Sequence, residues 1–384
     1  MDIITDNDKL SAVCSRLRQA DFVTVDTEFM RESTFWPLVC LIQIASPDEA
    51  HIIDPLADGL SLDPLFALMA DETVMKVFHA GRQDIEIFYH QGGLIPHPVF
   101  DTQVAAMVCG FGDSISYDQL VSRISGARID KTSRFTDWSK RPLTDRQLTY
   151  ALADVTHLRD VYASLAATLE EKGRANWVRE EMEILTSTET YRQHPEDAWR
   201  RLKLRVRKPI ELAVLKEIAA WRETEAQSRD VPRNRVLKDD ALYEIAAQQP
   251  RSRDDLARLR ALPRGYERSR SAEDILAAVG RALAIPTEKL PQLPKQRRGN
   301  GNTGAVVDLL KVLLKLKSEN HGVASKIIAT VDELEAIAGD DRAEVPALHG
   351  WRRELFGNDA IRLKKGQLAV AVNRNRLTTF ERGS

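Results

Sequence analysis

The chain has 384 residues, of which 43% are hydrophobic and 29% charged, a balance typical of a soluble globular protein with two or three domains. The net charge of −2 excludes a uniformly basic nucleic-acid-binding chain. Cys14, Cys40 and Cys109 form no disulfide framework and no CxxC metal site. The first residues are acidic, and no apolar run is long enough to span a bilayer. We therefore expect a cytoplasmic protein without a membrane anchor.

Strand and helix patterns alternate through the first half of the chain. Apolar or alternating runs predict strands at 22–29, 38–46, 50–55 and 75–80, and helical spacing predicts helices at 62–71 and 81–93. Residues 99–111 predict a short extended entry followed by a helix. Thr144 and Gln147 form a capping-box signature, which predicts a long helix that ends near Gly173. We expect one α/β domain over residues 1–190.

The second half of the chain predicts helices only. A first helical domain is expected at 206–285, with helices at 211–227, 238–248, 252–262 and 271–285. Residues 286–302 are rich in Pro, Gly and Asn, which is typical of a linker. A second helical domain is expected at 303–378, with helices at 305–320, 325–339, 347–357 and 364–373. The two sets are similar in length and order, which favours a duplicated module.

Positive charge gathers in one stretch of this half. Residues 199–238 hold twelve Lys or Arg and five Asp or Glu, a net charge of +7. Such a band can bind phosphates while the remaining surface is acidic, although a solvated linker followed by a polar helix face would look the same. Four of these cations lie around a Pro-containing turn and are candidates for phosphate contact: Arg229, Arg233, Arg235 and Lys238.

Asp26 and Glu28 are two residues apart in a predicted strand, so both side chains share one face, about 6.6 Å apart along the strand. Two acids on an otherwise buried strand are costly unless a cation pairs them. The alternative is an acidic strand end that is exposed to solvent.

Tyr150 and Asp154 are four residues apart on the long predicted helix and therefore share a face. By itself this spacing also fits a core tyrosine beside a surface charge. Asp84 opens the predicted helix after FHAGRQ, where the helix dipole favours a carboxylate with or without a further role.

The combination of these acids is more informative than any one of them. Two-metal hydrolysis of a phosphodiester needs several carboxylates that converge on a pair of ions. In the order and spacing of its acids, the sequence resembles the DEDDy class of DnaQ-like exonucleases, and within that class ribonuclease D. The matching motifs are TVDTEF, VFHAGRQD and YALAD, together with LIQI at 41–44 and FDTQ at 100–103.

This resemblance implies a catalytic set of Asp26, Glu28, Asp84, Tyr150 and Asp154. The four acids would ligate two divalent ions, Mg²⁺ or Mn²⁺, because the chain offers oxygen ligands and no zinc motif. Tyr150 would orient or deprotonate the attacking water. The fold implied is an α/β exonuclease domain with a ribonuclease-H-like mixed sheet flanked by helices, followed by two all-α HRDC-type domains.

Residues 208–285 resemble an HRDC domain, a helical module to which the family assigns RNA binding, and residues 303–378 resemble a second, more divergent copy. The function implied is a 3′→5′ exoribonuclease that trims RNA 3′ ends, with transfer-RNA precursors as substrates and no obligate protein partner. A single-stranded DNA 3′→5′ exonuclease and a non-catalytic RNA-binding scaffold stay open, because the acids alone cannot separate RNA from DNA.

Three further residues near the motifs have two readings each. Phe29 could stack on a terminal base or pack in the core. His79 could reach the scissile region or end a strand. Asp101 could support the metal ligands, but an N-cap ahead of Val104 is the role we expect.

Overall fold

The computed structural model describes residues 3–134, 136–293 and 303–382, which divide into two compact units. The first unit contains the described residues of 1–28, 40–190 and 297–384, and the second contains those of 29–39 and 191–296. The expected second helical domain therefore belongs to the same unit as the α/β domain. Among the described residues, we find no helix that combines the length and apolar character needed to cross a membrane.

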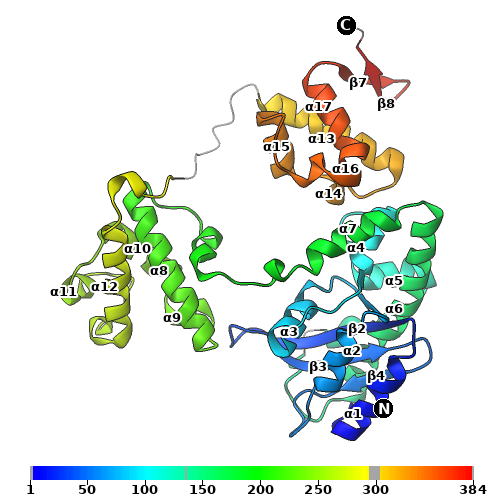
Figure 1. Ribbon diagram of the computed structural model, residues 1–384, viewed down its shortest axis with the longest axis horizontal. Coiled ribbons are helices and arrows are strands. Elements are labelled where there is room, and N and C mark those ends of the chain that lie inside the picture. The colour runs from blue at the N-terminus through cyan, green and yellow to red at the C-terminus, as the bar shows by residue number, and fades with distance from the viewer. Residues whose placement is uncertain (1–2, 135, 294–302, 383–384) are drawn as a thin grey trace. The chain divides into compact units, whose positions relative to one another are not determined.

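A six-stranded sheet in the order β1-β4-β3-β2-β5-β6 frames the first unit (Figure 1). Its strands are β1 (Ile3–Ile4), β2 (Phe22–Met30), β3 (Leu38–Ala45), β4 (Ala50–Ile53), β5 (Met75–Phe78) and β6 (Val99–Asp101). β4 runs antiparallel to β3, whereas the pairs β1–β4, β2–β5 and β5–β6 are parallel. The expected mixed sheet is confirmed, and only the short β1 was not predicted.

Helices pack against this sheet and were predicted in part. They are α1 (Asn7–Leu17), α2 (Asp63–Met69), α3 (Arg82–Gly92), α4 (Thr102–Cys109), α5 (Tyr117–Ser125), α6 (Asp145–Glu171) and α7 (Ala175–Leu185). The capping box is confirmed at the start of α6, where the Thr144 hydroxyl accepts from the Gln147 N–H and the Gln147 side chain accepts from the Thr144 N–H. The sequence did not predict α1, α5 and α7.

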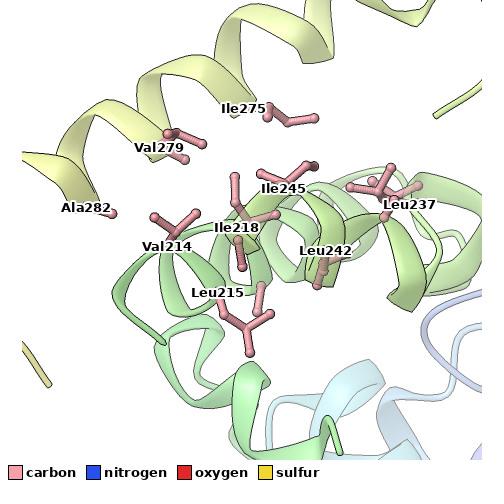
Figure 2. Close-up of a cluster of buried hydrophobic side chains, with 14 of the residues drawn as sticks. Val214, Leu215, Ile218, Leu237, Leu242, Ile245, Ile275, Val279 and Ala282 are labelled. Atoms are coloured by element: carbon pink, nitrogen blue, oxygen red, sulfur yellow. The ribbon is translucent and has the colours of Figure 1, made fainter. Parts of the chain in front are cut away.

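The second unit is a helical domain around its own apolar core. Its elements are η3 (Pro195–Arg201), α8 (Pro209–Ser228), α9 (Arg233–Val236), α10 (Asp239–Gln248), α11 (Arg253–Ala257), η4 (Tyr266–Arg268), α12 (Arg270–Leu283) and η5 (Thr287–Lys289). Figure 2 shows Ile218 of α8, Ile245 of α10 and Ile275 of α12 gathered in this core, and all three are fully buried. Of the expected linker, Leu290 packs against this core, and residues 294–302 lie outside the described residues.

The segment Phe29–Val39 belongs to this second unit by its contacts. Phe35 is 5% exposed and is part of the apolar core. The Asp230 carboxylate accepts hydrogen bonds from the backbone N–H groups of Phe35 and Trp36, each at 2.9 Å. The Arg233 guanidinium lies 4.5 Å from the centre of the Phe35 ring. The buried ring of Phe35 and the two hydrogen bonds to the Asp230 carboxylate thus hold the loop that joins β2 to β3.

The second helical domain repeats the order of the first for three helices. Its elements are α13 (Thr303–His321), α14 (Ser325–Ile328), α15 (Val331–Gly339), η6 (Pro346–Leu348), α16 (Gly350–Arg352), the π-helical turn η7 (Arg353–Gly357), α17 (Asn358–Lys364), β7 (Leu368–Asn373) and β8 (Arg376–Glu381). In both domains a helix of about twenty residues is followed by a single turn and then by a shorter helix. The HRDC-type duplication itself stays a prediction.

The helix predicted at 364–373 is wrong, because this segment forms the first strand of a β-hairpin. α17 ends at Lys364, and Gly366 then adopts a φ of +72°, which only glycine adopts without strain. Leu368–Asn373 pairs antiparallel with Arg376–Glu381. Arg374 and Asn375 both have positive φ, as a tight hairpin turn requires. The alternation in LAVAV was the strand signal that the helix interpretation overlooked.

The second helical domain is docked on α4 and α7 of the α/β domain. The Trp351 ring stacks on that of Trp177 of α7, with 4.5 Å between ring centres and 8° between planes. Arg352 forms an ion pair of 2.6 Å with Glu181, and both side chains are largely buried. The Ala324 N–H donates to the Met107 carbonyl at 2.9 Å. These contacts explain why the two domains form one unit.

Candidate active site

Strand β2 and helix α6 bring the first and third acidic motifs together. Thr24, Asp26 and Glu28 share one face of β2 by strand alternation. On that face the Thr24 hydroxyl donates to the Val155 carbonyl of α6 at 2.8 Å. Asp154 immediately precedes Val155, so this hydrogen bond fixes the turn of α6 that carries Asp154 beside β2.

Asp26, Glu28 and Asp154 form a tight cluster of carboxylates. One oxygen from each side chain can be chosen so that all three lie within 4.8 Å of one another, which suits a single cation. All three side chains are half-buried. Three like charges this close repel one another unless they are protonated or bound to a cation.

The electrostatics of the cluster reflect this repulsion. Burial raises the pKa of Asp26 well above its usual range, and the charges of Asp154, Asp84 and Glu28 raise it further. Burial followed by repulsion from Asp154 and Asp84 raises the pKa of Glu28 to about 9. Burial raises the pKa of Asp154 to about 7, against a hydrogen bond from Tyr150 that lowers it. A bound cation would favour the ionised forms of all three.

Asp84, from the second motif, lies next to this cluster but outside the group of three. It stands in the first turn of α3 and is 7% exposed. Its carboxylate accepts a hydrogen bond of 2.5 Å from the hydroxyl of Thr27, the residue between the two acids of β2. Burial raises the pKa of Asp84 to about 6, although the Thr27 hydrogen bond lowers it. Sequence reasoning missed Thr27, and the family motif TVDTEF contains it.

The turn before α3 is held by Asp101. Its carboxylate accepts from the N–H groups of Gln103 and Val104, which confirms the expected N-cap of α4. The same carboxylate accepts from the N–H of Ala80 at 3.2 Å and of Gly81 at 2.8 Å. Ala80 has a φ of +57°, so the turn that leads to Asp84 is strained and needs this support.

Tyr150 is placed by an aromatic neighbour and by Asp154. Its ring stacks on Trp138, which is 2% exposed, with 6.1 Å between ring centres. Its hydroxyl donates a hydrogen bond to the Asp154 carboxylate. Burial and the nearby acids raise the pKa of Tyr150 above its usual value, so the phenol stays protonated at neutral pH. As a protonated donor it can orient a nucleophile but does not serve as a strong base.

The loop before α6 contributes Trp138 and a cation that the sequence analysis did not single out. The charge of Arg134 lowers the pKa of both Glu28 and Asp154, which places its guanidinium near the acidic cluster. The loop is anchored by Arg141, whose guanidinium donates two hydrogen bonds of 2.6 Å to Asp54. A single exposed Arg in a polar loop carries no sequence signal, which is why it was missed.

The other predicted substrate-binding residues differ in their surroundings. Phe29 is half-buried directly after Glu28 in β2. Nδ1 of His79 lies 3.0 Å from the Thr102 hydroxyl, and its ring packs 5.3 Å from that of Tyr117. Tyr117 in turn donates to the Ala153 carbonyl of α6. His79 thus supports the helix that carries Asp154, and its contact with substrate stays a prediction.

Two of the four predicted cations of the first helical domain form ion pairs with acids of that domain. Arg233 forms ion pairs of 2.5 and 2.6 Å with Glu223, which is 1% exposed. Arg229 pairs with Glu225 at 3.4 Å. Arg235 and Lys238 are exposed, with no acidic partner among the residues that the structure describes. Phosphate contact by these cations stays a prediction, and Arg233 neutralises a buried carboxylate.

Comparison with known proteins identifies the family of the chain. Residues 1–170 match the 3′-5′ exonuclease family, and residues 211–279 match the HRDC domain. The fold and the acidic cluster therefore define a DnaQ-like 3′→5′ exonuclease joined to an HRDC domain. Ribonuclease D of Nitrobacter hamburgensis is 61% identical over 382 residues, covering 100% of both chains, and that of Bartonella henselae is 49% identical, covering 99% of this chain and 94% of that protein. The chain belongs to the ribonuclease D family.

A solved structure of the family has the same fold along the chain. The crystal structure of Escherichia coli RNase D, described as an exoribonuclease involved in structured RNA processing, matches with a TM-score of 0.82 and 30% identity. The match covers 95% of this chain and 98% of that one. The arrangement of an exonuclease domain followed by helical domains is therefore shared.

Proposed function

We propose that this chain removes nucleotides one at a time from the 3′ end of RNA, by hydrolysis at the site formed by Asp26, Glu28, Asp84, Tyr150 and Asp154. The observation that carries the proposal is the convergence of Asp26, Glu28 and Asp154 within 4.8 Å beside the Tyr150 hydroxyl. Membership of the ribonuclease D family supports RNA as the substrate. Transfer-RNA precursors in the cytoplasm are the substrates we propose, on the same family ground.

The donor set fits two divalent cations. Asp26, Glu28 and Asp154 would hold one ion, and Asp84, which is hydrogen-bonded to Thr27 at their side, would complete the set for a second. All of these donors are carboxylate oxygens, which suits Mg²⁺ or Mn²⁺ better than softer metals. When bound, such ions supply a nucleophile at neutral pH and stabilise the negative charge of the leaving 3′ oxygen.

The protein residues position the reactants around this chemistry. The Tyr150 hydroxyl, held by the Trp138 stack and donating to Asp154, can orient the attacking water by accepting a hydrogen bond from it at the edge of the cluster. The Arg134 guanidinium provides positive charge beside Glu28 and Asp154, where the phosphate of the scissile bond has to enter. Arg235 and Lys238 of the first helical domain would contact phosphates of the substrate.

The test is a 5′-labelled single-stranded RNA incubated with Mg²⁺ or Mn²⁺, beside a DNA strand of the same sequence. Asp154→Asn should lower the rate on the order of a thousandfold, and a chelator should abolish it. Asp160→Asn is the matched control, because Asp160 is an exposed acid on the same helix.

Each outcome of this assay leads to a definite conclusion. A ladder of RNA shortened from the 3′ end, absent in Asp154→Asn and present in Asp160→Asn, would support the proposal. Degraded DNA beside intact RNA would favour a single-stranded DNA exonuclease. RNA that is bound but never shortened would favour a non-catalytic scaffold.

A further inference from the structure

Gln43 is a fully buried polar residue in the middle of β3, within the LIQI segment at 41–44. Neither Oε1 nor Nε2 of its side chain has a hydrogen-bond partner among the residues that the structure describes. A buried amide without partners lowers stability, because it gives up its hydrogen bonds to water and gains none in the protein. Its neighbours Ile42 and Ile44 are apolar and equally buried. An amide at this position therefore indicates a role beyond packing.

The side chain of Gln43 projects from the face of the sheet opposite to α1. Its neighbour in β3, Ile44, pairs with His51 of β4. Nε2 of His51 lies 2.7 Å from the Glu49 carboxylate, and Glu49 pairs with Arg16 of α1 at 2.8 Å. His51 and Ile44 therefore face α1. Because side chains alternate along a strand, Gln43 faces away from it.

The acids of β2 project from the same face as Gln43. Helix α1 contacts α2, and α2 contacts α3. Phe88 of α3 packs on Phe78 of β5, with 6.4 Å between ring centres. Two residues before Phe78, Lys76 pairs with Val23 of β2, so α1, α2 and α3 cover the Val23 side of the sheet. Asp26 lies three residues after Val23 and projects from the other side, which α6 covers.

Gln43 and Asp26 are neighbours on adjacent strands. β2 and β3 lie side by side and are joined by residues 31–37, too few for the crossover that parallel strands need, so they are antiparallel. The Thr24 hydroxyl lies 3.3 Å from the Ala45 carbonyl oxygen. Asp26 lies two residues after Thr24, and Gln43 lies two residues before Ala45. The two side chains thus stand beside each other under α6.

We propose that Gln43 is a positioning residue of the metal site, whose amide donates a hydrogen bond to the Asp26 carboxylate when that carboxylate binds a cation; the proposal rests on the proposed function. A carboxylate has several acceptor positions, so it can bind an ion and accept from an amide at the same time. Such a hydrogen bond orients the carboxylate and strengthens metal binding. A neutral amide suits this role, because a Lys or Arg here would compete with the cations for the acids.

Gln43→Met tests this role, because methionine has a similar length and no amide. In the presence of a chelator, the melting temperature of the variant should be equal to that of the wild type or higher, because an unpaired buried amide is replaced by an apolar side chain. Affinity for Mn²⁺, measured by calorimetry, should fall about tenfold. A glutamine that only served the fold would not combine weaker metal binding with unchanged or higher stability.

The matched control is Ile44→Met, which places the same side chain one residue further along β3, on the opposite face. This control should keep the Mn²⁺ affinity of the wild type. Equal losses of Mn²⁺ affinity in both variants would show a general distortion of β3 and overturn the proposal. Wild-type Mn²⁺ affinity in Gln43→Met would overturn it as well. Gln43→Leu has the same expected result and serves if the methionine variant does not fold.

The metal-binding readout also separates this proposal from the catalytic one. If the wild-type chain shortens RNA with Mg²⁺ or Mn²⁺ and Gln43→Met binds Mn²⁺ normally, the role of Gln43 fails alone. If the wild-type chain binds no Mn²⁺ and leaves RNA intact, the proposed metal site fails, and the role of Gln43 fails with it.

Discussion

The Thr27 hydroxyl donates a hydrogen bond of 2.5 Å to the carboxylate of Asp84, and this contact joins the first and second acidic motifs. Thr27 is 6% exposed and lies between Asp26 and Glu28 in β2. Burial raises the pKa of Asp84 to about 6, and the hydrogen bond from the Thr27 hydroxyl limits this rise. The residue between two acids of the motif thus keeps a third one ionised.

Thr27→Val should therefore weaken metal binding and activity at the site, although the size of the side chain is kept. Valine keeps the shape of threonine but leaves Asp84 without its donor, which costs about 1–3 kcal/mol for a buried carboxylate. We expect a tenfold or larger fall in activity at neutral pH and a higher Mg²⁺ requirement. Thr27→Ser keeps the hydroxyl and should retain most activity. If the valine variant matched the wild type in a magnesium titration, the Thr27 contact would have no role in the site.

Tyr150→Phe tests the water-orienting hydroxyl alone. Phenylalanine keeps the stack on Trp138 and removes the donor to Asp154, so we expect kcat to fall roughly a hundredfold. Affinity for Mn²⁺, measured by calorimetry, should fall far less than kcat, because the four carboxylates stay in place and only Asp154 loses a donor. Normal kcat in this variant would show that Tyr150 is only a packing residue.

The metal-free protein should lose stability as the pH rises from about 5 to 8. Folding raises the pKa of Glu28 to about 9 and that of Asp154 to about 7, so the folded state holds protons that the unfolded state releases. The stability that these protonated carboxyls contribute is complete at a pH below their pKa values in the unfolded chain. It is lost as the pH rises through their pKa values in the folded protein.

Thermal unfolding with a chelator at several pH values would measure this trend. Glu28→Gln removes one titrating group, so the melting temperature should fall less steeply with pH. With saturating Mg²⁺ the melting temperature should instead rise with pH, because the cation competes with protons and binds better as pH rises. A metal-free melting temperature that rose steadily from about pH 5 to 8 would contradict the sign derived from these carboxyls.

Trp351→Ala should loosen the second helical domain from the exonuclease domain. The variant removes a ring that is 4% exposed and stacked on Trp177, at a cost of about 3–5 kcal/mol. We expect a lower melting temperature and faster proteolysis between α13 and α17. Trp351→Phe keeps part of the stack, so its melting temperature and rate of proteolysis should lie between those of the wild type and of the alanine variant. Equal proteolysis of the alanine variant and the wild type would show that other contacts suffice for docking.

Local patterns in the sequence determined much of the site. The D-x-E spacing placed Asp26 and Glu28 on one face of a strand, and the Y-x-x-x-D spacing placed Tyr150 and Asp154 on one face of α6. The capping box at Thr144 and the N-cap at Asp101 were also readable. All of these follow from backbone periodicity and from hydrogen bonds between residues close in sequence, which do not depend on how distant segments meet.

Only the tertiary structure decided the contacts between distant segments. No local pattern pairs Thr27 with Asp84, stacks Trp138 on Tyr150, or commits Arg233 to the buried Glu223. The hairpin at 368–381 is by contrast a local contact, and the alternation in LAVAV indicated its first strand, which is stable once Arg376–Glu381 satisfies its backbone. The sequence alone thus determined which residues could perform the chemistry, and the fold decided their partners, because those partners depend on long-range packing.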